Sequence, residues 1–147
     1  MLKNGIMVDD ADYAVIGEYK KYANEVGEIQ TASPDDVSGL IKKLITDYNS
    51  KTEHDLYDIA DFHARFEKIH PFYDGNGRVG RLIMLKQCLE NDIVPLYIDD
   101  HIKYLYYCGL KEWQTSGMKE RLLDVFLYFG ECSLTCNTLI HLVVPSV

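Results

Sequence analysis

The fold is decided by one stretch of sequence, His70-Pro71-Phe72-Tyr73-Asp74-Gly75-Asn76-Gly77-Arg78-Val79-Gly80-Arg81. It holds a titratable base, a carboxylate, two glycines around an asparagine, and two arginines three positions apart. Glycines let the backbone turn tightly and let a ligand approach the amides. A helix that begins at such a loop offers unpaired N–H groups and a partial positive charge to an anion. The stretch therefore predicts a helix start that binds phosphate.

The two arginines of this stretch also favour the prediction of an anionic ligand. Arg78 and Arg81 fall in the first turn of the expected helix, on neighbouring parts of one face, and planar guanidinium groups bind phosphate oxygens well. Cations at a helix N-terminus oppose the helix dipole, at a cost of about 0.3 kcal/mol or more, unless an anion is supplied from outside. A histidine, a Gly-x-Gly turn or an arginine pair alone would be unremarkable in function. Here all are compatible with one mechanism.

Asp74 and His70 add metal and base chemistry to this loop. Magnesium usually takes one or two protein carboxylates together with substrate phosphates, so Asp74 favours a Mg-nucleotide over a bare phosphate. His70, four residues upstream, has an ordinary pKa of about 6.5 and can accept a proton from a hydroxyl at neutral pH. The residues together predict attack of a hydroxyl on a magnesium-bound phosphate ester.

The segments flanking this stretch have helical patterns. A helix is expected from about Asp55 to Lys68, ended with the help of Pro71, since the residue before proline is pushed out of the helical region. Another is expected from just after Gly77 to near Asn91. It carries these residues: Val79, Leu82, Ile83, Lys86 and Leu89. Further downstream we expect an extended connector over Ile93–Ile98 and helices over Ile102–Trp113 and Glu120–Phe129.

Upstream, apolar residues from Val37 to Tyr48 recur at helical spacing, which predicts an amphipathic helix. Ser33 suits the N-cap and Pro34 the first helical position. Asp12–Tyr22 is expected to hold a short helix and Glu25–Thr31 a short hairpin. The fold class is thus mainly α with one small β element. We expect one domain over residues 1–131, followed by an irregular apolar tail over residues 132–147.

Composition sets outer limits on function. A chain of 147 residues, 47% of them hydrophobic, can bury the core of one domain. A formal charge of -8 and a pI near 5.0 argue against a broad nucleic-acid or anionic-membrane surface, because both partners are polyanions. We find no signal-peptide pattern and no apolar run near the roughly 18 residues that span a bilayer. The expectation is a soluble, cytoplasmic protein.

The stretch resembles the signature of the Fic family, H-P-F-x-[D/E]-G-N-G-R-x-x-R, and matches it at every specified position. The resemblance extends over roughly residues 3–115. It is carried by these further segments: Tyr19-Lys20-Lys21, Val26-Gly27-Glu28, the helix after Ser33, Phe62-His63 through Ile69, Leu82 to Cys88, and Tyr104 to Trp113. It implies a compact Fic-type helical core with a β-hairpin flap.

Members of this family mostly transfer AMP from ATP to a Ser, Thr or Tyr hydroxyl of a target protein. The resemblance implies the following roles: His70 as general base, Asp74 as magnesium ligand, Gly75, Asn76 and Gly77 as an anion-binding nest, Arg78 and Arg81 as ligands of the outer phosphates, and Phe72 as a plug in the core. It also implies that Gly27, Glu28, Ile29 and Gln30 form a flap that docks the target by strand addition. ATP and Mg²⁺ are the implied co-substrate and cofactor.

Other activities stay open. The Doc-type branch carries a lysine-containing loop and transfers phosphate, so the retained Gly77 favours AMP, while transfer of phosphocholine is not excluded. A silent toxin component, controlled by a separate antitoxin, is the alternative from another class. Assembly with copies of the chain also stays open.

The family's inhibitory motif, [S/T]-x-x-x-E-[G/N], has no match upstream of the flap. Downstream, Ser116 to Glu120 has its spacing, but Arg121 replaces the last residue, and Gly117 weakens a helix by about 1 kcal/mol. We therefore expect an inhibitory segment, where there is one, to act in trans.

Overall fold

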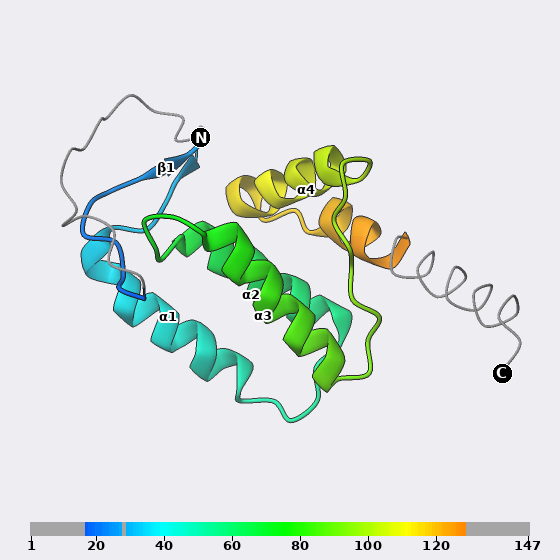
Figure 1. Cartoon of the computed structure of the whole chain (residues 1–147). Helices are drawn as coiled ribbons and strands as arrows, with labels where there is room; N and C mark the ends of the chain where they lie inside the picture. Colours follow the sequence, from blue (N-terminus) through cyan, green and yellow to red (C-terminus); the bar gives the residue numbers. More distant parts are fainter. Residues whose placement is uncertain (1–16, 28, 129–147) are drawn as a thin grey trace, which may run out of the picture.

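A computed structural model describes residues 17–27 and 29–128. The elements, in chain order, are β1 (Glu25–Val26), β2 (Ile29–Gln30), α1 (Pro34–Tyr48), α2 (Leu56–Ile69), α3 (Asn76–Glu90) and α4 (Lys103–Ser116). A further helical stretch covers residues 120–128 (Figure 1). The mainly α fold with a small hairpin is confirmed. Glu28, residues 12–16 and the tail over 132–147 lie outside the described residues, and the domain extent of 1–131 stays a prediction.

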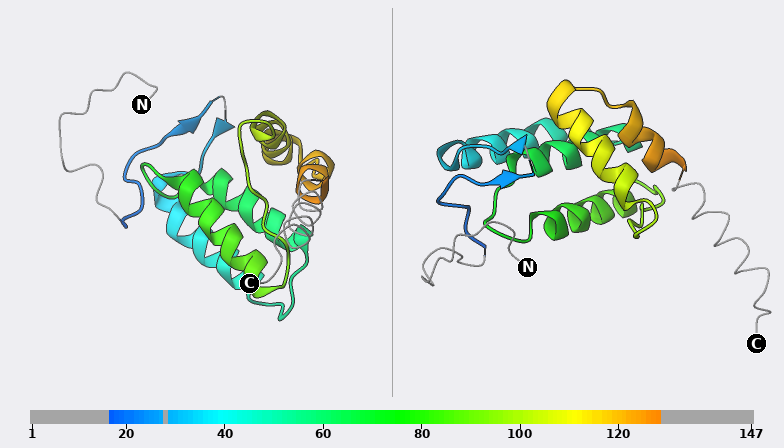
Figure 2. Two further views of the ribbon diagram at one scale, coloured as in Figure 1. Left: turned by 45° about the vertical axis from the view of Figure 1, so that its right-hand side comes forward. Right: turned by 90° about the horizontal axis from the view of Figure 1, so that it is seen from above.

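Helix α2 is the centre of the fold and packs on α1, α3 and α4 (Figures 1 and 2). One core cluster joins α1 and α2 through Val37, Ile41, Leu44, Phe62, Phe66 and Ile69. The other joins α2 to the downstream helices and includes Ile59, Ala60, Met84, Tyr106, Trp113, Leu122 and Phe126. Because α2 is buried on both sides, its C-terminal end is a rigid support for the motif loop.

Helix α3 begins at Asn76, earlier than the predicted start after Gly77. Asn76 and Gly77 therefore belong to its first turn. The apolar positions Leu82 and Leu89 are 64% and 63% exposed. The buried side instead holds these residues: Asn76, Gly80, Met84, Gln87 and Cys88. An ideal Cβ on Gly80 would lie 3.2 Å from the Phe66 ring. The face of α3 that meets α2 is thus set by Gly80, whose small size permits close helix contact, and not by the large side chains of Leu82 and Leu89.

The helix predictions upstream are confirmed with two corrections. Helix α1 begins at Pro34, but the Ser33 side chain makes no capping hydrogen bond, and its backbone carbonyl accepts from Asp36 N–H at 3.0 Å. The helix expected over Asp12–Tyr22 is wrong for residues 17–22, which form a turn and bends.

Helix α4 ends at Ser116, and Gly117 follows in the left-handed region with φ 75°. Ser116 to Glu120 is therefore not one helix, as the weak helical tendency of Gly117 predicts. None of the helices among the described residues is long and apolar enough to cross a membrane.

Candidate functional site

His70 occupies an unusual backbone position at the end of α2. It is the C-cap, with φ 51° and ψ 62°, and its N–H donates to the Phe66 carbonyl. A non-glycine residue in this left-handed region costs roughly 1 kcal/mol, and such positions cluster at functional sites. Burial lowers the pKa of His70, and the backbone carbonyl of Glu67 acts in the opposite direction. The imidazole is therefore neutral at pH 7 and can accept a proton.

Asn76 fixes the shape of the loop between His70 and α3. Its side chain is 1% exposed. The Oδ1 atom accepts from the Phe72 N–H at 2.8 Å, and Nδ2 donates to the Phe72 carbonyl at 2.7 Å. The side chain thus faces the loop, so of the predicted nest Asn76 can contribute only its backbone N–H. Phe72 itself packs against Tyr19 and Phe66, with ring centroids 6.0 and 6.5 Å apart, in agreement with a plug.

The two arginines fold back over the first turn of α3. An ideal Cβ on Gly75, whose φ is 83°, would lie 3.4 Å from Arg78 Nη2, and one on Gly77 would lie 3.0 Å from Arg81 Nη1. The first turn contains no acidic residue. Glycine at both positions leaves room for the guanidinium groups, so two cations and the helix N-terminus meet at one place. The arrangement is compatible with the predicted anion site, which stays a prediction.

Asp74 lies at the solvent edge of this site. Its side chain and that of Arg78 are 74% and 73% exposed, and the two form an ion pair of 3.2 Å. An exposed carboxylate of this kind fits magnesium, which keeps several waters and binds substrate phosphates alongside one or two carboxylates. Across residues 17–27 and 29–128, no three His, Cys, Asp or Glu side chains cluster as a ready-made metal site.

Two open cavities adjoin Arg81. One, of about 340 Å³, is lined by Arg81, Tyr97, Ile98, Asp99, Asp100, Lys103 and Tyr107. The other, of about 460 Å³, is mostly apolar and is lined by Arg78, Arg81, Leu82, Met84, Leu85 and residues 95–98. Sequence reasoning missed the connector residues among them, because an extended segment without periodicity gives no sign of which helix it covers.

Lys20, like the connector residues, was given no role by the sequence reasoning. It is 3% exposed, and its Nζ donates to Asn24 Oδ1 at 2.8 Å, Thr31 Oγ1 at 2.7 Å and the Ile69 carbonyl at 3.3 Å. Its backbone N–H donates to the Pro71 carbonyl at 2.8 Å. Lys20 therefore ties the hairpin to the motif loop. A lysine inside a polar run looks exposed in sequence, so only the close resemblance of Tyr19-Lys20-Lys21 to the family marked it.

The hairpin lies beside the motif loop, as Figure 1 shows. Its strands are antiparallel, with Glu25 opposite Gln30 and Val26 opposite Ile29. Gly27 adopts φ 62° in the turn. The described sheet has two strands, so each has an outer edge for a further strand. The predicted docking residues Ile29 and Gln30 lie on β2.

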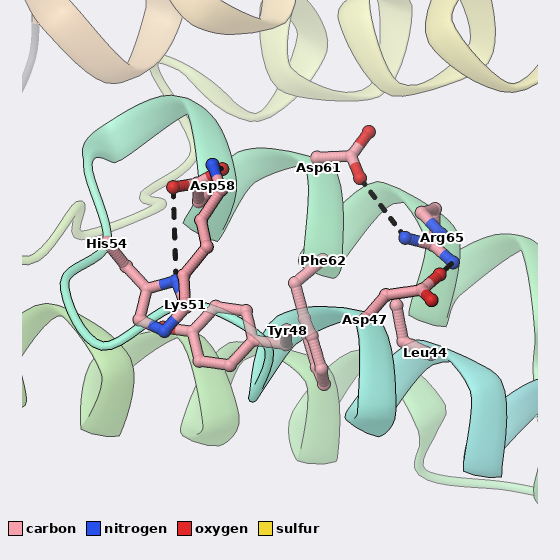
Figure 3. Close-up of a pocket in the computed structure, with 9 residues that line it drawn as sticks. All are labelled: Leu44, Asp47, Tyr48, Lys51, His54, Asp58, Asp61, Phe62 and Arg65. Carbon is pink, nitrogen blue, oxygen red and sulfur yellow. Dashed lines mark hydrogen bonds and ion pairs between the residues drawn. The ribbon is translucent and has the colours of Figure 1, made fainter.

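A separate small pocket lies between α1, α2 and the loop that joins them (Figure 3). Its charged side chains are paired with one another: Arg65 binds Asp47 at 2.7 Å and Asp61 at 3.5 Å, and Lys51 binds Asp58 at 2.6 Å. His54 stacks on Tyr48 with ring centroids 3.6 Å apart. This pocket contains no residue of the motif, and its Arg65–Asp47 ion pair joins α2 to α1.

The arrangement of helices and hairpin around a His-Asp-Gly-Asn-Gly-Arg loop defines a structural class. The fold is similar to that of a Fic domain containing signalling protein from Bacteroides thetaiotaomicron VPI-5482, with a TM-score of 0.67, 23% identity, and coverage of 82% of this chain and 52% of that one. It is also similar to the BepC protein of Bartonella tribocorum, solved with bound AMPPNP, with a TM-score of 0.62, 21% identity, and coverage of 75% of this chain and 56% of that one.

Sequence comparison places the chain within this class. The model of the Fic/DOC family matches residues 3–88. The protein adenylyltransferase Fic of Drosophila grimshawi is 31% identical over 125 residues, which cover 76% of this chain and 26% of that protein. The chain belongs to the Fic/DOC family. It spans about a quarter of the length of such curated relatives.

Proposed function

We propose that this domain transfers AMP from Mg-ATP to a hydroxyl group of a target protein. One observation carries the proposal: the end of α2 holds a histidine beside a helix N-terminus over which two guanidinium groups fold. The names of the curated relatives support the same chemistry. The apolar cavity next to Arg78 and Arg81 suits a nucleoside whose phosphates lie at the arginines.

In the proposed reaction, His70 takes the proton from the target hydroxyl. The hydroxyl oxygen then bonds to the α-phosphorus, the bond from that phosphorus to the bridging oxygen breaks, and pyrophosphate leaves. The N–H groups of the first turn of α3 and both arginines stabilise the charge on the phosphates. Asp74 would hold Mg²⁺, which neutralises phosphate charge when bound. The target would add as a strand to the hairpin, whose Gly27, Ile29 and Gln30 lie beside the loop.

One assay tests the reaction. The domain is incubated with magnesium, cell lysate and ATP labelled at the α or the γ position, in parallel with His70→Ala. We expect label on protein only from α-labelled ATP, and loss of transfer by a factor of roughly 10² or more in His70→Ala. Label from γ-labelled ATP alone would contradict AMP transfer and favour phosphate transfer. Equal transfer by both proteins would exclude His70 as the base.

A second candidate is a silent component controlled by a separate chain. Arg81 forms no ion pair within the described part of the chain and lines two open cavities, so a carboxylate from another protein could reach it. Nucleotide binding without transfer, together with copurification of a small second chain, would favour this candidate.

A further inference from the structure

A buried carboxyl group lies beneath the proposed nucleotide site and has no part in the mechanism above. It belongs to Glu67 on α2. The Oε1 atom is buried and has no hydrogen-bond partner among the described residues. An ideal Cβ on Gly80 would lie 2.5 Å from this oxygen. The carboxyl group therefore packs directly against the backbone of α3, one residue before Arg81.

Arg81 from α3 and Tyr106 from α4 interact electrostatically with Glu67, and His63 from α2 lies beside the same Gly80. The Nε2 atom of His63 lies 2.6 Å from the Tyr106 hydroxyl. Burial lowers the pKa of His63 to about 4, so its ring is neutral, and Nε2 accepts a hydrogen bond from the Tyr106 hydroxyl when the ring proton is on Nδ1. Tyr106 then has no proton left to donate to Glu67. The positive charge in this set belongs to Arg81.

Glu67 and Arg81 interact without direct contact. Burial raises the pKa of Glu67 to about 7, and the charge of Arg81 acts against that rise. The same guanidinium lowers the pKa of the Tyr106 hydroxyl against the larger effect of burial. Arg81 also lines the two open cavities. The guanidinium lies over Gly77 at the proposed phosphate position, while the Oε1 atom of Glu67 lies against Gly80 in the same helix, close enough for the two charges to interact.

We propose that Glu67 is a positioning residue for Arg81: its ionised carboxyl group attracts the guanidinium toward the core, in competition with a nucleotide phosphate, so that nucleotide binding and ionisation of Glu67 oppose each other. The inference rests on the proposed function, which puts nucleotide phosphates at Arg81. By linkage, binding of the nucleotide is accompanied by proton uptake at Glu67.

The first test needs no ligand. The pKa of the Glu67 carboxyl group is measured by NMR in the wild-type domain, in Arg81→Gln and in the control Arg121→Gln, whose arginine pairs with Glu112 at 3.0 Å. We expect the pKa of Glu67 to rise in Arg81→Gln only, because a nearby positive charge that favours the ionised form is removed. An unchanged pKa in Arg81→Gln would overturn the proposal.

The second test measures binding of Mg-AMPPNP by calorimetry at pH 6, 7 and 8, in two buffers with different ionisation enthalpies. The variants are Glu67→Gln and the control Glu90→Gln, an exposed residue on α3 that pairs with Lys86. At pH 8 we expect Glu67→Gln to bind roughly three- to tenfold more tightly than the wild type, in the lower range of couplings between two sites. Proton uptake near pH 7 should be lost in Glu67→Gln and kept in Glu90→Gln.

Weaker binding by Glu67→Gln at pH 8, or proton uptake equal to that of the wild type, would overturn the inference. Both readouts are independent of transfer. A domain that binds the analogue but transfers no AMP from ATP would therefore count against the proposed function alone.

Discussion

Single residues in the motif loop have two kinds of role, and the structure separates them. Arg78 and Arg81 place their guanidinium groups over the first turn of α3, where an anion is proposed to bind, and His70 lies at the end of α2 that leads into the same loop. Asn76 directs its side chain back into the loop. The motif therefore combines residues proposed to react or bind phosphate with an asparagine that supports the loop after His70.

Asn76→Asp should destabilise the domain by about 2 to 4 kcal/mol. The substitution replaces the Nδ2 donor, 2.7 Å from the Phe72 carbonyl, with an oxygen that repels it in a buried position. Urea unfolding at pH 7 measures the change. Asn49→Ala is the control, since Asn49 is exposed at the end of α1 and should change stability by less than about 0.5 kcal/mol. An equally stable Asn76→Asp would show that the loop does not depend on this pair of hydrogen bonds.

The sequence predicts where the motif residues lie along the helices better than it predicts which way their side chains point. Spacing places Arg78 and Arg81 on neighbouring parts of a helix start, and the structure has them there. The inward direction of Asn76 and the burial of Glu67 depend on the distance between α2 and α3, which no local pattern contains. Helical spacing puts either Phe66 or Glu67 at the end of the side that carries Ile59 and His63, so sequence alone does not decide that the Oε1 atom of Glu67 is buried.

Elements of secondary structure follow the sequence where capping and periodicity act locally. The start of α1 at Pro34 belongs to this group, whereas α4 continues past its predicted end at Trp113 and stops at Ser116, before Gly117. The buried face of α3 does not belong to it, because Gly80 allows α2 to approach and turns Leu82 and Leu89 to the solvent. Close contact between two helices at a glycine depends on the tertiary structure, so the spacing of apolar residues along α3 does not predict which face is buried.

The hairpin is joined to the motif loop mainly through Lys20, which gives a prediction for these elements. In Lys20→Met the three Nζ hydrogen bonds to Asn24, Thr31 and Ile69 are lost, so the hairpin should detach more often. Amide hydrogen exchange should accelerate about tenfold or more in β1, in β2 and at Phe72, for a loss of roughly 1.4 kcal/mol or more of local stability.

Lys21→Met is the matched control for this experiment. Lys21 is exposed and pairs with Glu18 at 3.2 Å, so its loss should leave exchange in the hairpin unchanged. The same acceleration in both variants would mean that the hairpin is held by something other than Lys20.

Over the whole molecule, the net negative charge opposes the binding of an anionic nucleotide, which the proposed function requires. The chain carries a formal charge of -8, which repels a nucleotide at long range, while Lys20, Arg78 and Arg81 lie at the motif end of α2 and α3. A buried lysine, a half-buried glutamate whose Oε1 atom is buried, and a histidine with positive φ lie at that same end. Stability and nucleotide binding should therefore depend on the same titratable groups.

Two buried groups should shape the pH dependence of stability, with opposite signs. The pKa of Glu67 is raised by burial to about 7, so its protonated form is favoured by folding, and the free energy of unfolding falls as pH rises from about 4.5 to 7. The pKa of His63 is lowered by burial to about 4, so stability is lost as pH falls from about 6.5 to 4. Each effect amounts to about 3 kcal/mol, and they offset each other in the wild type.

Glu67→Gln separates the two effects. The variant keeps the contribution of His63 and loses that of Glu67, so its free energy of unfolding should fall by about 3 kcal/mol more than that of the wild type between pH 7 and pH 4.5. At pH 8 the variant should be the more stable protein, because the wild type then carries an ionised carboxyl group whose buried Oε1 atom has no hydrogen-bond partner among the described residues. Urea unfolding from pH 4.5 to 8 measures both curves, and parallel curves would show that Glu67 titrates as an ordinary exposed glutamate.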